Sequence, residues 1–126
     1  MDKKNFNELS DKVYNDIFKK YNTLDDYVEK EIRSARLDAD EYSESGSCFI
    51  YFSDYATHIN DIDSALSHLD FDYDLTDEEW EKLVDVAESA ECKAYEDKLD
   101  ALKDEGYKVK YKWVATSLQF KLRKES

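Results

Sequence analysis

The spacing of apolar residues in this 126-residue chain changes at Gly106 from a helical period to alternation, and that change predicts an α+β fold. Before Gly106, apolar side chains recur every three or four positions, which indicates amphipathic helices. After it, apolar and basic residues alternate over 107–113 and again over 118–123, which indicates two strands. The alternation shifts phase at 115–117, so we expect a turn there and a C-terminal β-hairpin.

Helices are expected before this hairpin at about 5–21, 24–40, 54–69 and 76–105. The first two are joined so closely that we expect a helical hairpin. A continuous apolar run, Cys48–Phe52, predicts a short strand buried on both faces. The expected order is therefore a helical hairpin, a short strand, two further helices, the last of them long, and the β-hairpin. The three strands would form an antiparallel sheet packed against helices.

A single domain spanning 1–126 is expected, because a chain with no Pro and two Gly shows no linker. The third helix would turn one apolar stripe toward the core of this domain. Its residues are Tyr55, Ile59, Ile62, Leu66 and Leu69.

The last helix carries the clearest start signal. Thr76 and Glu79 are spaced as a capping box, in which each side chain binds the backbone N–H of the other residue. Glu91 and Lys98 lie near the centre of the apolar, alanine-rich face of this helix. Buried charges are costly unless paired, so we interpret both positions as places where the helix extends beyond a small core. The alternative is that they contact a partner.

Charge is distributed unevenly along the chain, which has a net charge of −13. Leu37–Glu81 contains fourteen acidic residues and no Lys or Arg, whereas residues 107–126 contain six basic residues and one acidic residue. An acidic surface of this strength repels nucleic acid and anionic membranes and attracts basic proteins. The alternative is that the acidity serves only solubility.

No pattern in the sequence indicates catalysis. His58 and His68 would point about 80° apart on a helix, so they do not converge on one metal ion. Cys48 and Cys92 have no neighbouring base, and two glycines are too few for a phosphate-binding loop. We therefore expect a protein that is not an enzyme, with no catalytic residue, no cofactor and no assigned metal ligand.

The nearest metal motif is a calcium-binding loop. Carboxylates occupy positions one, three, five, nine and twelve of the EF-hand spacing, at Asp70, Asp72, Asp74, Glu78 and Glu81. Leu75 stands at the sixth position, where the sharp turn of the loop needs Gly. Looser binding of a divalent cation by these carboxylates stays open as an alternative.

The lysines of the C-terminal hairpin raise the question of nucleic-acid binding. Their aromatic neighbours Tyr107, Tyr111 and Trp113 alternate with them and would therefore face the core, where they cannot stack on bases. We expect a solvated sheet face whose lysines oppose edge-to-edge aggregation.

The acidic residues can form one extended partner-binding surface. Carboxylates three or four positions apart on a helix lie about 5–6 Å from one another. DNA places a phosphate about every 3.4 Å along each strand, so rows of such carboxylates give a comparable density of charge. The predicted partner-binding residues are Asp61, Asp63, Asp70, Asp72, Asp74, Asp77, Glu78, Glu79, Glu81, Asp85 and Glu88.

In overall character the chain resembles the small inhibitors carried by phages and mobile elements, in particular anti-CRISPR proteins and DNA mimics. The shared features are small size, strong acidity, ten tyrosines, no Pro and no catalytic motif. No motif is matched residue by residue, so no site residue is transferred. The resemblance implies binding to a nuclease effector, such as a Cas protein, and obstruction of its access to DNA. The basic C-terminal hairpin departs from this pattern and would contact guide RNA or an acidic patch on the partner.

The sequence thus predicts a non-enzymatic inhibitor that binds a basic nucleic-acid-handling protein, a CRISPR-Cas effector or another nuclease, through an acidic, DNA-mimicking surface. The alternatives are an immunity protein or antitoxin against a nuclease toxin, a structural or regulatory protein-binding module, and a divalent-cation-binding protein. We expect no direct binding to DNA and no membrane contact. The first residues lack the apolar segment of a signal peptide, so we also expect a cytoplasmic location, in the host cell if the protein is phage-encoded.

Overall fold

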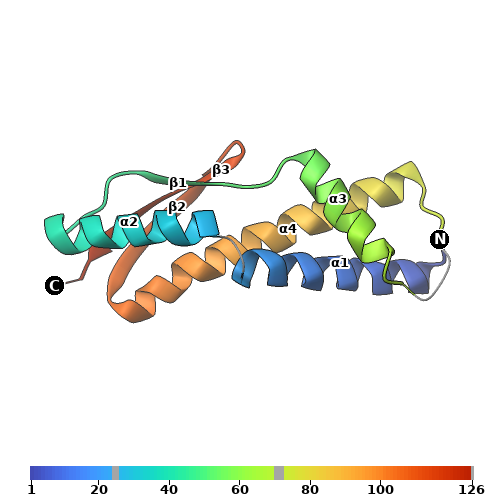
Figure 1. Ribbon diagram of the computed structural model, residues 1–126, viewed down its shortest axis with the longest axis horizontal. Coiled ribbons are helices and arrows are strands. Elements are labelled where there is room, and N and C mark those ends of the chain that lie inside the picture. The colour runs from blue at the N-terminus through green and yellow to red at the C-terminus, as the bar shows by residue number, and fades with distance from the viewer. Residues whose placement is uncertain (24–25, 70–72, 126) are drawn as a thin grey trace. The chain divides into compact units, whose positions relative to one another are not determined.

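The computed structural model describes residues 1–23, 26–69 and 73–125 (Figure 1). Its elements in chain order are α1 (Lys3–Thr23), α2 (Asp26–Tyr42), β1 (Cys48–Tyr51), α3 (Tyr55–Leu66), α4 (Asp77–Ala101), the 3₁₀ turn η1 (Leu102–Glu105), β2 (Tyr107–Val114) and β3 (Ser117–Lys124). The three strands form one antiparallel sheet packed against helices, and β2 and β3 form a hairpin. The predicted α+β fold is confirmed.

The chain divides into two compact units, which are described separately. Unit 1 comprises Met1–Thr23 and Ser53–Ala94, and unit 2 comprises Leu24–Phe52 and Tyr95–Ser126. A helical hairpin was expected of α1 and α2. The two helices fall in different units, α1 in unit 1 and α2 in unit 2, so this pair is not part of either unit's description. The expectation of a single domain stays a prediction.

Unit 1 is helical, and its core is built from one apolar stripe on each of three helices. α1 packs against α3, and the two helices lie side by side in Figure 1. The α1 stripe keeps the predicted spacing of three and four residues, while α4 contributes small side chains that allow a close approach. The buried apolar residues are Leu9, Val13, Ile17 and Tyr21 of α1, Ile62, Ala65 and Leu66 of α3, and Leu83, Val84, Ala87, Ala90 and Ala94 of α4.

Side-chain caps start the helices of unit 1. The predicted capping box of α4 is confirmed: the Glu79 N–H donates to Thr76 Oγ1 at 3.1 Å, and the Thr76 N–H donates to Glu79 Oε1 at 3.0 Å. Asp54 caps α3 by accepting the Thr57 N–H at 2.8 Å. α1 begins at Lys3, earlier than predicted, because Asp2 accepts the Lys4 N–H at 3.2 Å.

Unit 2 contains the sheet, in the strand order β1-β3-β2, with α2 packed on β1 and β3 (Figure 1). Gly106 ends η1 with φ 93°, as its predicted role as a left-handed stop requires. The prediction that Cys48–Phe52 is buried on both faces is wrong. β1 is an edge strand that pairs with β3 alone, and its side chains alternate between the two faces of the sheet, so Ile50 is buried while Tyr51 is 59% exposed on the opposite face.

Candidate functional site

An open groove of about 470 Å³ lies between α3 and α4 of unit 1. On α3 it is lined by Tyr55, Ile59 and Asp63, which are spaced four residues apart and so share one helix face. On α4 it is lined by Asp77, Trp80 and Glu81, from the first turns of the helix. The groove therefore combines aromatic and aliphatic surface with three carboxylates.

The three groove carboxylates are available to a partner. Asp63, Asp77 and Glu81 are all exposed, and none of their carboxylates has an ion pair or hydrogen bond within the described parts of the chain. Among the described residues, no basic side chain lines the groove. Unit 1 as a whole contains 17 acidic and 7 basic residues, a net charge of −10, whereas unit 2 contains 14 and 11, a net charge of −3. The field at the groove thus favours a cation.

An acidic stripe continues from the groove along α4. Its members Asp77, Glu81, Asp85 and Glu88 are spaced at four, four and three residues, which places them on one face of the helix. Neighbouring carboxylates at this spacing lie about 5–6 Å apart. Asp85 is exposed and Glu88 is half-buried, so the stripe presents negative charge to solvent beyond the groove.

Two of the predicted partner-binding residues have structural roles instead. Asp61 is 2.8 Å from the Lys20 ammonium and also accepts the Tyr21 hydroxyl, and its side chain is only 15% exposed. Glu79 completes the α4 capping box and lies 3.4 Å from the N-terminal amine of Met1. These partners offset the charge of both carboxylates, so Asp61 and Glu79 are less available to a binding partner than the exposed carboxylates of the groove.

The remaining predicted residues lie around the start of α4. Asp74 is exposed in the segment before the helix, and Glu78 is exposed and weakly paired with Lys82 at 3.5 Å. Asp70 and Asp72 lie outside the described residues, so the first three positions of the EF-hand spacing, 70–72, do as well. Among the residues that the structure describes, no group of three or more His, Cys, Asp or Glu side chains is arranged to hold a metal ion.

A buried polar network in unit 1 was missed by the sequence analysis. Glu91 of α4 and His58 of α3 are both fully buried, with Glu91 Oε2 2.7 Å from His58 Nε2. The other oxygen, Glu91 Oε1, accepts the Ser53 N–H at 2.9 Å. The interpretation that α4 extends beyond the core at Glu91 is therefore wrong. It is also wrong at Lys98, whose side chain in unit 2 is 8% exposed and 3.4 Å from Glu29.

This network positions α3 rather than meeting a substrate. The hydrogen bond between Glu91 Oε2 and His58 Nε2 joins the two helices, and both side chains are closed to solvent. Ser53 Oγ also bonds the Tyr21 hydroxyl, whose pKa is raised by burial, so the network extends to α1. The signal for it in the sequence was an isolated Glu among the alanines of α4 together with a His four positions before the stripe residue Ile62.

Family models, curated protein sequences and solved structures were compared with this chain, and none matches. Within the described residues, no helix has both the length and the apolar character needed to cross a membrane. The function must therefore be inferred from the groove and the surfaces themselves.

Proposed function

We propose that this protein is a non-enzymatic inhibitor that binds a basic, nucleic-acid-handling protein through the acidic groove and stripe of unit 1. The observation that carries the proposal is the groove lining, in which Tyr55 and Trp80 accompany Asp63, Asp77 and Glu81. Aromatic faces attract cations, and carboxylates bind guanidinium groups in two-point contacts. This combination is a receptor for an arginine or lysine side chain of a protein partner.

The proposed partner is a nuclease, and a CRISPR-Cas effector in particular. Proteins of this class hold DNA or RNA in channels lined by arginine and lysine. The acidic stripe on α4 offers carboxylates at a spacing comparable to that of phosphates, and the groove offers a pocket at one end of the stripe for a protruding cation. Inhibition would follow from occupying the channel in place of DNA, with rapid and salt-sensitive capture.

A competition assay tests this function. Labelled target duplex would be bound to RNA-loaded Cas nucleases and, in parallel, to nuclease toxins, and the protein would be titrated into each complex. We expect stoichiometric displacement of DNA from at least one effector, weakening as salt is raised. Displacement only from a nuclease toxin would assign the protein as an immunity protein. Binding to an effector without displacement of DNA would contradict the mimicry.

A further inference from the structure

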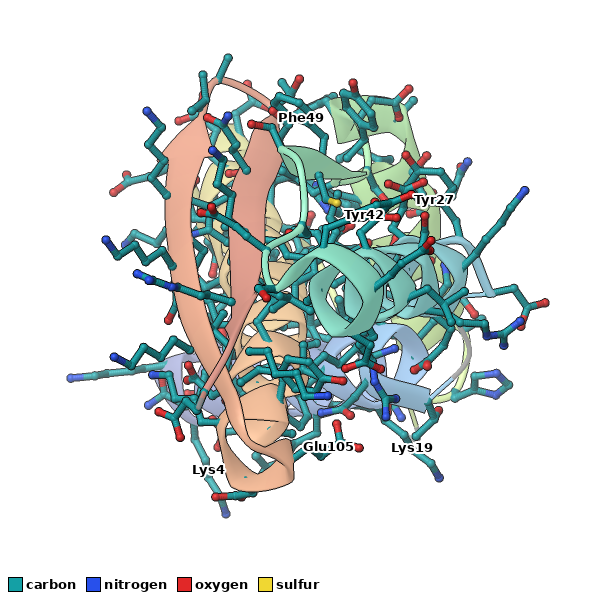
Figure 2. The ribbon with its side chains drawn as sticks, turned by 90° about the vertical axis from the view of Figure 1, so that its left-hand side faces the viewer. Lys4, Lys19, Tyr27, Tyr42, Phe49 and Glu105 are labelled. Atoms are coloured by element: carbon teal, nitrogen blue, oxygen red, sulfur yellow. The ribbon has the colours of Figure 1, made fainter. Side chains whose placement is uncertain are left out.

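The outer face of the sheet in unit 2 is uncovered and basic. The register of the hairpin places Lys108 opposite Arg123 and Lys110 opposite Lys121, and Lys112 continues the row on β2. All five side chains are exposed, and none forms an ion pair with a described residue. Figure 2 shows nitrogen-tipped side chains projecting from the side of the hairpin that faces away from α2.

These lysines are not explained by protection of a sheet edge. Like charges directly opposite each other across two strands are destabilising. Lysine on an edge strand discourages aggregation, but Lys121 and Arg123 belong to β3, which is the central strand. A bound polyanion would relieve the repulsion along this hairpin.

Aromatic side chains share the outer face with the lysines. Phe49 of β1 lies opposite Gln119, and its ring is stacked 6.4 Å from that of Tyr51, with 19° between the ring planes. The aromatic residues of β2 lie elsewhere, since Tyr107 and Trp113 are held on the inner face of the sheet. There Tyr107 donates its hydroxyl to Asp40 at 2.7 Å, and Trp113 donates Nε1–H to Glu96 at 2.8 Å. The edge strand β1 supplies the outer-face rings instead, the half-buried Phe49 and the exposed Tyr51.

One row of residues across the sheet matches the order of phosphate, sugar and base in a nucleotide. Lys112, Gln119 and Phe49 occupy directly opposed positions on β2, β3 and β1, so a cation, an amide and an aromatic ring follow one another at about 4.8 Å per strand. Along β2 the lysines repeat every second residue, or about 6.8 Å, which resembles the phosphate repeat of an extended single strand. A hollow of about 350 Å³, lined by Lys110, Lys112, Gln119 and Lys121, lies on this face.

We propose that the outer sheet face binds single-stranded RNA. The lysine row of β2 contacts the phosphates, Phe49 and Tyr51 stack on the bases, and the Gln119 amide lies at the level of the sugar. There it can both donate to and accept from a ribose 2′-hydroxyl, which DNA lacks. This site is separate from the acidic groove, since all its residues belong to unit 2. It replaces the expectation of a merely solvated sheet face.

The acidity of the chain does not oppose this site at close range. Two carboxylates bind side chains of the sheet, and both do so on its inner face: Asp40 accepts the Tyr107 hydroxyl, and Glu96 accepts the Trp113 Nε1–H. Two acidic residues lie at one end of the outer face: Glu44, whose backbone pairs with that of Arg123, and Glu125, which lines a hollow with Lys108 and Arg123. More distant charges are screened beyond about 10 Å at 0.1 M salt.

The experiment measures fluorescence anisotropy of a labelled oligouridylate of about ten nucleotides, titrated with the full chain between about 50 and 200 mM salt. The variant K110Q/K112Q/K121Q is expected to bind at least tenfold more weakly. Its slope of log K against log salt should be shallower by about 2, as expected for three lost phosphate contacts on a single strand. The variant Y51S should bind about tenfold more weakly with its salt slope unchanged. The matched control K3Q/K4Q/K19Q neutralises three exposed lysines of α1 and should bind like the wild type.

Several outcomes would overturn the proposal once circular dichroism shows the variants folded. One is no binding up to about 100 μM, the weak end of non-specific nucleic-acid binding. Another is an equal loss of affinity in the α1 control. Equal binding of oligodeoxyuridylate would refute the role of the 2′-hydroxyl, and displacement of RNA by polyglutamate at equal charge would reassign the face to an acidic protein. None of these results bears on the groove of unit 1, so the two proposals can fail independently.

Discussion

His58 Nε2 lies 2.7 Å from Glu91 Oε2, and both side chains are completely buried between α3 and α4. Because Glu91 also accepts the Ser53 N–H, one carboxylate fixes both the start of α3 and its packing on α4. The groove lies between the same two helices, with Ile59 adjacent to His58 in the sequence. The buried pair therefore holds the walls of the candidate site in place.

Glu91→Ala should lower the free energy of unfolding by about 3–5 kcal/mol, because it leaves a buried imidazole and a buried backbone N–H without their acceptor. Urea denaturation followed by circular dichroism measures this loss. Asp85→Ala, an exposed carboxylate on the same helix, is the control and should change stability by no more than about 0.5 kcal/mol. The double substitution H58L/E91M should recover much of the stability, since both polar groups are then removed together. A loss of less than about 1 kcal/mol in Glu91→Ala would show that the pair is not structural.

Glu79→Gln should make unfolding less sensitive to acid. The Thr76 N–H bonds the Glu79 carboxylate and lowers its pKa, and the N-terminal amine acts in the same direction. The folded pKa is thus below the unfolded value of about 4.3, so the stabilisation is present above that pH and is lost as pH falls through the folded pKa. Thermal melts of wild type and Glu79→Gln should differ at pH 7 and converge below about pH 4. Glu78→Gln, at an exposed neighbouring position, serves as the control, and an equal effect there would argue against the capping box.

Ala115→Gly should stabilise the hairpin of unit 2. Ala115 has φ 51° in the two-residue turn between Val114 and Ser117, a conformation that costs an L-residue about 1–2 kcal/mol and costs glycine little. Part of this gain is offset by the greater freedom of glycine in the unfolded chain, so we expect a net increase of about 0.5–1 kcal/mol in the free energy of unfolding. Fluorescence of Trp113 during denaturation reports on the hairpin. Thr116→Gly, where φ is not positive, should destabilise; the turn geometry would be wrong if the two substitutions had the same sign.

Local signals in the sequence predicted the α+β fold, but they could not show which faces would be covered. The capping box of Thr76 and the stop at Gly106 depend on neighbouring residues, and both were predicted. The burial of Glu91 depends on His58, 33 residues away, and no local pattern pairs them. Tyr51 is exposed because it lies on the outer face of the sheet, opposite the buried Ile50, and the apolar composition of β1 could not indicate that this face is uncovered.

The candidate site was predicted only in part, for the same physical reason. Asp63, Asp77 and Glu81, which line the groove, were among the predicted partner-binding residues. Tyr55 was assigned to the apolar stripe of its helix, yet it is 61% exposed and lines the groove. The packing of α3 on α4 brings this ring to the carboxylates, and that packing is tertiary.

The proposed function is tested most directly by two variants that lose the same number of negative charges. Their affinity is measured for the nuclease from which the wild-type protein displaces DNA. One variant, D63N/D77N/E81Q, neutralises the groove, and the other, E8Q/D11N/D16N, neutralises three exposed carboxylates of α1. The affinity of both variants would be measured by titration calorimetry at about 50 and 200 mM salt, because the higher salt concentration screens charges over a shorter distance. We predict that the groove variant binds at least 30-fold more weakly, a loss of about 2 kcal/mol, while the α1 variant stays within about threefold of the wild type. Equal weakening of the two variants would show that only total charge matters, and an unchanged affinity of the groove variant would place the binding surface elsewhere.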